Sequence, residues 1–161
     1  MEQIIYRNKN WYLLLDAGEL GLQRLSFLTK QEYSSLAKKN IANAFSRKEL
    51  QDLNIKLDKY FSGEPIIFDE PMDLQIGTPF QQKVWQALLT IDFGKYITYK
   101  ELADKIDKPK AARAVGNAVG ANPIPLIIPC HRVIAAGKRL GGFSAGLDIK
   151  RALLAVENIL L

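Results

Sequence analysis

The hydrophobic pattern of the chain changes around residues 64–79, and this break constrains the fold more than any other feature. The first thirty residues form three β-rich runs separated by turn residues, Gln3–Arg7, Trp11–Asp16 and Leu22–Leu28. After residue 77, apolar residues recur at helical spacing. The segment between these parts holds three prolines and shows no clear period. The pattern predicts an α+β protein, with a small N-terminal antiparallel sheet carrying helices and a mostly helical C-terminal domain.

The break also predicts two domains, an N-terminal α+β domain with its linker at 1–76 and a second domain at 77–161. Helices are expected at Gln31–Lys38 and Arg47–Phe61, and a short strand is expected at Ile66–Phe68. A chain of 161 residues, 48% of them hydrophobic, can bury one core or two small ones. A large multidomain enzyme is therefore excluded.

Four helices are expected after residue 77. Thr78 can cap the first, with Pro79 in its first turn. Thr98 and Glu101 form a capping box that opens the second. The predicted helices are Thr78–Thr90, Thr98–Ile106, Lys110–Ala121 and Leu147–Ile159. The tight turn between the second and third helices predicts a helix-turn-helix.

The positive charge lies in the C-terminal half. Residues 77–161 hold 12 Lys and Arg against 6 Asp and Glu, whereas residues 1–76 hold 10 against 11. This imbalance favours a polyanionic partner such as nucleic acid, although a solvated basic face is an alternative. The apolar runs are too short to cross a bilayer, and Glu2 replaces the basic start of a signal peptide. We expect a cytoplasmic protein without a membrane role.

The third of these helices, Lys110–Ala121, is expected to have one apolar and one small polar face. Two glycines in a helix this short cost about 1 kcal/mol each relative to alanine, so close approach to another backbone is expected. That backbone could belong to DNA or to the protein itself. The apolar face comprises Ala111, Ala114, Val115, Ala118 and Val119, and the opposite face Arg113, Gly116, Asn117 and Gly120.

The only cysteine, Cys130, adjoins the only histidine, His131, after an apolar run stiffened by prolines. One cysteine and one histidine form neither a disulfide nor a structural zinc site, so no metal is expected. A reactive thiolate here needs a base and a charge partner. His131 and Glu157, on the buried side of the last helix, are candidates, with a water between Cys130 and His131. The alternative is that Cys130 and His131 are ordinary core residues.

The segment Ile128–Val133 reads Ile-Pro-Cys-His-Arg-Val, and Lys110–Gly116 and Asn122-Pro123 precede it. Together these segments resemble the O6-alkylguanine-DNA alkyltransferases, also called methylated-DNA–protein-cysteine methyltransferases. The resemblance is dense from residue 77 to residue 157. It implies DNA repair by direct damage reversal, in which a single-turnover, cofactor-free enzyme takes the alkyl group of O6-alkylguanine in duplex DNA. O4-alkylthymine is a further candidate substrate.

The same resemblance implies five catalytic residues. Cys130 would accept the alkyl group, activated through His131 and Glu157. Asn122 would brace the turn before the active-site segment, and Tyr99 would hydrogen-bond guanine N3 as the base departs.

For DNA, the resemblance implies a helix-turn-helix in the minor groove and a nucleotide flipped out of the duplex. Arg113 would fill the gap left by that nucleotide, and Pro125 would wall the base pocket. The Val133 carbonyl and the Ser144 amide would read the guanine edge. The remaining residues expected at DNA are Gly116 and Asn117.

Two other functions stay open at this point. A Cys-His-Glu hydrolase or acyltransferase would use the same three side chains but turn over repeatedly and would not need Arg113. A non-catalytic module for recognising alkylated DNA would bind without transfer. For the repair enzyme we expect a monomer that can cluster along DNA.

Overall fold

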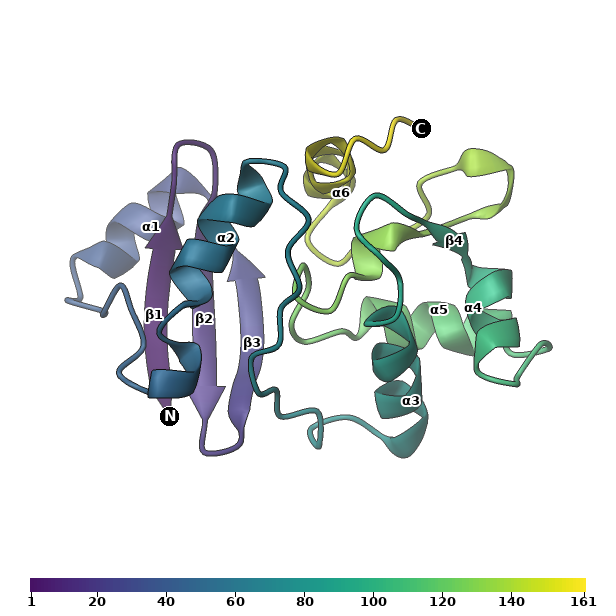
Figure 1. The fold of residues 1–161 in the computed structure, drawn as a ribbon, viewed down its shortest axis with the longest axis horizontal. Helices are drawn as coiled ribbons and strands as arrows, with labels where there is room; N and C mark the ends of the chain where they lie inside the picture. The colour runs from purple at the N-terminus through teal and green to yellow at the C-terminus, as the bar shows by residue number, and fades with distance from the viewer.

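The computed structural model describes all 161 residues and confirms the α+β fold class (Figure 1). Its N-terminal part contains an antiparallel sheet in the order β1-β2-β3. The strands are β1 (Glu2–Arg7), β2 (Tyr12–Gly18) and β3 (Gly21–Phe27). Helices α1 (Lys30–Ala37) and α2 (Leu53–Phe61) follow, and α2 lies across one face of the sheet in Figure 1.

The sheet is buried on both faces at its edge strand β1. Ile4, Ile5 and Tyr6 are consecutive and all buried. Because successive side chains of a strand point to opposite faces, other elements must cover both sides of β1. One continuous hydrophobic core then runs from this sheet into the C-terminal part. The division of the chain at residues 76 and 77 stays a prediction.

The helix predicted at Arg47–Phe61 is wrong at its start. A 3₁₀ turn, η1 (Lys48–Leu50), comes first, and α2 begins only after Asp52, whose side chain makes no capping bond. Residues three apart align on a 3₁₀ turn, so Leu50 still reaches the core at 1% exposure. The apolar spacing is satisfied by two short helical pieces instead of one helix.

The strand predicted at Ile66–Phe68 is also wrong. These residues belong to no strand, and Ile67 is 84% exposed. The linker meets the sheet further on, where the Leu22 amide donates to the Pro71 carbonyl at 2.8 Å. Gly21 makes this contact possible, since a Cβ there would lie 2.1 Å from the Pro71 oxygen. The edge of β3 is thus occupied by a later part of the linker.

The C-terminal part is mostly helical, with the predicted capping box at Thr98 and the predicted cap at Thr78, which also forms a capping box with Gln81. Consecutive helices α4 and α5 form the expected helix-turn-helix. No helix of the structure has the length and hydropathy required to span a membrane. The elements are α3 (Pro79–Leu88), β4 (Ile97–Thr98), α4 (Tyr99–Lys105), α5 (Ala112–Gly120), η2 (Cys130–Arg132), β5 (Val133–Ile134), η3 (Ala136–Lys138) and α6 (Leu147–Val156).

The last helix ends earlier than the predicted Leu147–Ile159. Asn158 adopts a left-handed conformation with φ 58°, and the Ile159 amide donates back to the Leu154 carbonyl at 2.8 Å. This Schellman closure stops the helix and leaves Glu157 as its C-terminal cap. Glu157 is nevertheless buried, as predicted.

Candidate active site and nucleic-acid interface

The loop between α5 and the cysteine is bonded at two points by the side chain of Asn122. Its side-chain oxygen accepts from the Ile124 amide at 3.0 Å, and its nitrogen donates to the Ile128 carbonyl at 2.8 Å. Between these bonds Leu126 has φ 78°, a conformation that bulky residues rarely adopt. Asn122 therefore closes a strained turn directly before Cys130.

Tyr99 is brought to the same place by a short parallel pairing. Ile97 and Thr98 pair with Val133 and Ile134, so the first residue of α4 lies beside the cysteine segment. The Tyr99 ring packs on Gly141, where a Cβ would meet the ring at 2.9 Å. Burial raises the pKa of Tyr99.

Cys130 starts the 3₁₀ turn η2. The residue is only 2% exposed. Burial raises the pKa of its thiol to about 11, although a hydrogen bond with the Asn122 side chain and the charge of Lys150 act in the opposite direction. The resting sulfur is therefore a protonated thiol, and its reaction requires a base.

His131 turns its two ring nitrogens toward different surroundings. Nε2 lies 2.7 Å from Oε1 of Glu157. Nδ1 is buried and has no hydrogen-bond partner within the protein. Burial lowers the pKa of His131, with Glu157 opposing that effect. A neutral His131 that donates from Nε2 to the carboxylate leaves Nδ1 as its proton acceptor.

Glu157 is the centre of a buried network. Arg132 donates from Nε to Oε2 at 2.9 Å, and the Gly94 amide donates to the same oxygen at 2.9 Å. The hydroxyl of Tyr60, on α2, donates to Oε1 at 2.7 Å. Burial alone would raise the pKa of Glu157, but hydrogen bonds from His131 and Arg132 lower it to about 2. The carboxylate is thus ionised at neutral pH.

Lys150 is a second buried cation at this site. Its side chain is 0% exposed and donates to the Val133 carbonyl at 2.6 Å and to the Gly142 carbonyl at 3.1 Å. Burial lowers its pKa to about 8, partly offset by neighbouring Cys130. The Val133 carbonyl, expected to read guanine, already accepts one bond, and a carbonyl oxygen can accept a second.

Sequence reasoning missed Tyr60, Arg132 and Lys150. A signal for Lys150 was available, because it lies three and four residues before Leu153 and Leu154 on the buried stripe of α6. For Tyr60 the same periodicity indicated only a core position. No pattern within the N-terminal half could reveal that its ring reaches a residue 97 positions away.

Two of the residues expected at the base pocket line one cavity. Pro125 and Ser144 border a space of about 420 Å³ between strand β3 and the active-site loop, together with Asn122. Cys130 does not line this cavity. No group of three or more His, Cys, Asp or Glu side chains is placed to hold a metal ion.

The outer face of α5 is open, with Arg113 and Asn117 exposed. A Cβ on Gly116 would lie 3.8 Å from the Tyr99 ring, and one on Gly120 would meet nothing within 4 Å. Internal packing therefore does not require either glycine. Ala114, expected on the buried face, is exposed because it lies about 100° around the helix from Val115.

Exposed lysines lie on α4 and on the turn that follows it, interspersed with exposed Glu101, Asp104 and Asp107. Together with Arg113 they leave an excess of positive charge, which favours a phosphate backbone. These lysines are Lys100, Lys105, Lys108 and Lys110.

The fold and site define an α+β protein with a helix-turn-helix and a buried Cys-His-Glu network. Residues 79–159 match the family described as 6-O-methylguanine DNA methyltransferase, DNA binding domain. Residues 3–74 match the ribonuclease-like domain of the same methyltransferases. The chain belongs to the 6-O-methylguanine DNA methyltransferase family, which confirms the resemblance.

Proteins with similar sequences and structures support this family assignment. A methylated-DNA–protein-cysteine methyltransferase of Methanosarcina barkeri is 43% identical over 91% of this chain and 90% of that protein. The Mycobacterium tuberculosis relative is 55% identical over 103 residues, which are 64% of this chain but only 62% of that protein. The crystal structure of Mycobacterium tuberculosis OGT in complex with DNA has a TM-score of 0.76 and 37% identity, covering 98% of this chain and 92% of that one.

Proposed function

We propose that this protein repairs DNA by transferring the alkyl group of O6-alkylguanine in duplex DNA to Cys130, once per molecule. The observation that carries the proposal is a buried thiol followed directly in the chain by buried His131. The Nε2 atom of that histidine is engaged by Glu157, and its Nδ1 is without a protein partner. The names of the relatives and the DNA in the mycobacterial complex support the same substrate.

The reaction begins with proton movement from the Cys130 sulfur to Nδ1 of His131, directly or through a water. The thiolate then attacks the alkyl carbon, so an S–C bond forms while the C–O6 bond breaks and its electron pair stays on guanine. The Glu157 carboxylate stabilises the imidazolium. Because the product is a thioether, which water does not readily hydrolyse, the protein is consumed.

On the departing base, Tyr99 is proposed to donate to guanine N3, and the Val133 carbonyl and Ser144 amide to contact the guanine edge. Pro125 forms the pocket wall, and the strained turn braced by Asn122 holds that wall in place. A thiol that is 2% exposed meets only a base that has left the stack.

On the duplex, α5 is proposed to enter the minor groove, with Arg113 filling the space of the flipped nucleotide. Gly116 and Asn117 keep the helix face low enough for close contact with the backbone. Such binding is independent of sequence and weakens with salt. A monomer that clusters along DNA, activity on O4-alkylthymine, and a cytoplasmic location stay predictions.

Two alternative functions predict different behaviour of Cys130. A recognition module would bind O6-methylguanine DNA without acquiring the methyl group. A Cys-His-Glu hydrolase would turn over repeatedly, and the open basic face of α5 argues against it.

The test is the intact mass of the protein after incubation with duplex DNA containing O6-methylguanine, followed by peptide mapping. We expect a gain of about 14 Da, the mass of one CH₂, on Cys130 that saturates at one per protein. Cys130→Ser should show no gain while retaining DNA affinity. Tight lesion binding without a mass gain in the unmodified protein would favour the recognition module, and neither binding nor gain would favour the hydrolase.

A further inference from the structure

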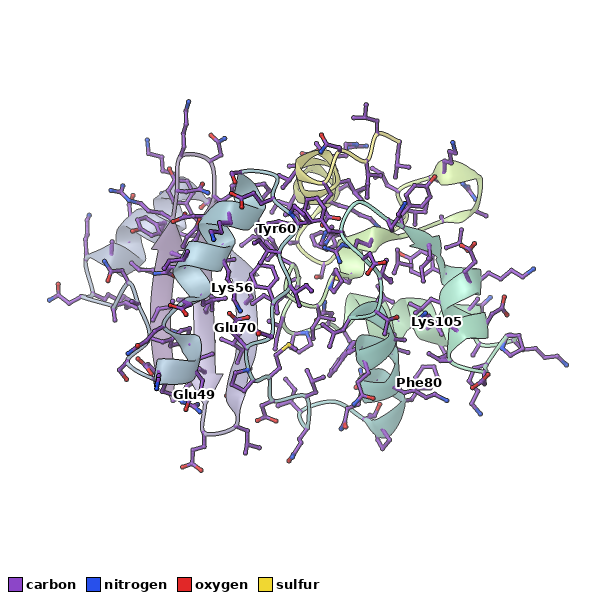
Figure 2. All side chains as sticks on the ribbon, in the orientation of Figure 1. Glu49, Lys56, Tyr60, Glu70, Phe80 and Lys105 are labelled. Carbon is purple, nitrogen blue, oxygen red and sulfur yellow. The ribbon has the colours of Figure 1, made fainter.

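One side chain of the N-terminal half reaches the catalytic network. Tyr60 lies on α2, on the side that faces the C-terminal part (Figure 2). It is 0% exposed. Its hydroxyl is the only polar group of residues 1–76 that bonds to Glu157 or His131. The N-terminal part is therefore in direct contact with the relay that activates Cys130.

Four polar atoms meet at Oε1 of Glu157, two of which are Nε and Nη2 of Arg132 at 3.1 and 3.0 Å. The Tyr60 hydroxyl donates to this oxygen at 2.7 Å, and Nε2 of His131 lies 2.7 Å from it. The Tyr60 oxygen is itself 3.2 Å from Nε2. Burial and then the Glu157 charge raise the pKa of Tyr60 well above its usual value. The hydroxyl consequently stays protonated and acts as a donor to the carboxylate.

The charge on Glu157 Oε1 determines how strongly His131 is held in its protonated form. A bare carboxylate at 2.7 Å favours the imidazolium, and a protonated His131 cannot accept the Cys130 proton. Every donor to Oε1 reduces that stabilisation. The other groups that act on His131 are Arg132 and Lys150, whose positive charges also lower its pKa.

We propose that Tyr60 is a positioning residue for alkyl transfer: its hydroxyl takes up part of the negative charge on Glu157, which keeps His131 neutral and able to accept the Cys130 proton. The inference rests on the proposed function. It assigns to the N-terminal half a contribution to the chemistry in addition to its contribution to the core.

A purely structural role for Tyr60 is the competing explanation, because its ring packs against Phe61, Phe68 and Phe93. Tyr60→Phe keeps these ring contacts and removes only the hydroxyl. Tyr6→Phe is the matched control. The Tyr6 hydroxyl also donates to a carboxylate, Asp58 at 2.6 Å, but that carboxylate lies outside the relay.

The experiment measures the single-turnover rate of methyl transfer from O6-methylguanine duplex between about pH 5 and pH 8.5, at saturating DNA. In Tyr60→Phe we expect the acid limb to move up by about 0.5–1 pH unit, so that the rate at pH values well below the midpoint falls roughly three- to tenfold. The rate on the alkaline plateau should change less than about twofold. Tyr6→Phe should keep the pH profile of the unmodified protein.

A second readout is independent of turnover. Because the chain has one histidine, the ¹⁵N resonances of its imidazole report the titration and tautomer of His131 directly. Tyr60→Phe should raise the titration midpoint by the same amount as the acid limb. A Tyr60→Phe protein whose pH profile and imidazole titration match the unmodified protein would overturn the inference, as would a uniform loss of rate without a shift.

The outcomes separate the two proposals. If the unmodified protein acquires no methyl group, the proposed function fails. If it does, and Tyr60→Phe is indistinguishable from it, only the role of Tyr60 fails.

Discussion

The relay and the outer face of α5 are both polar but are built in opposite ways. Around Glu157 both carboxylate oxygens accept bonds from protein donors, and the side chain is buried. On α5, Arg113 and Asn117 extend into solvent, and two glycines leave room that no protein group fills. The difference indicates that the hydrogen bonds to Glu157 are supplied within the protein, whereas the α5 face is shaped for a partner molecule.

The largest effect, a loss of stability, is expected from removing the charge of Glu157. Glu157→Gln keeps the size of the side chain but leaves buried Arg132 without its counter-charge. Removing one member of a buried ion pair costs about 3–5 kcal/mol of unfolding free energy. Urea unfolding would measure the loss.

The control for this change is Asp148→Asn, which removes an exposed ion pair with Arg151 on the same helix. It should alter stability little. If the two variants unfold at the same urea concentration, the hydrogen bonds around Glu157 do not stabilise the protein as inferred.

An intermediate effect is expected from Arg113→Ala on the α5 face. Repair of duplex DNA should slow by about tenfold or more, equivalent to about 1.4 kcal/mol, because the space of the flipped nucleotide is no longer filled. Reaction with free O6-benzylguanine, which needs no flipping, should be unchanged. Single-turnover assays on both substrates measure this, with Arg151→Ala on α6 as the control. Equal losses on the two substrates would remove Arg113 from the flipping step.

The smallest effects are expected from Gly116→Ala, which should change stability and DNA affinity in opposite directions. The structure has room for the added methyl group, so the helix should gain about 0.5–1 kcal/mol of stability. DNA affinity should nevertheless fall, because the methyl group stands between α5 and the backbone. Thermal unfolding and fluorescence anisotropy measure the two changes.

The control for Gly116→Ala is Ser34→Ala on the exposed face of α1. It should add stability through helix propensity without changing DNA affinity. If Gly116→Ala binds DNA as tightly as the unmodified protein, then α5 does not approach DNA closely at this position.

Local signals in the sequence predicted much of the fold. The helix cap at Thr78 and the capping box at Thr98 depend on residues close in the sequence, and both formed as predicted. Predictions failed where local and distant partners compete. The segment predicted as the start of α2 is a 3₁₀ turn, and the linker residues that bond to β3 are Pro71 and Asp73, further along the chain than Ile66–Phe68.

By itself, the sequence determined the α+β class and the helix-turn-helix, and it singled out Cys130, His131 and Glu157 as a candidate site, because these depend on periodicity, caps and rare residue types. Tertiary structure alone decided which atoms meet. Tyr60 from α2 and Arg132 from η2 both donate to the carboxylate of Glu157, at the end of α6. Such a meeting depends on how separate elements pack. Because an unpaired buried charge costs free energy, the buried charges are paired whatever the distance between the partners along the chain.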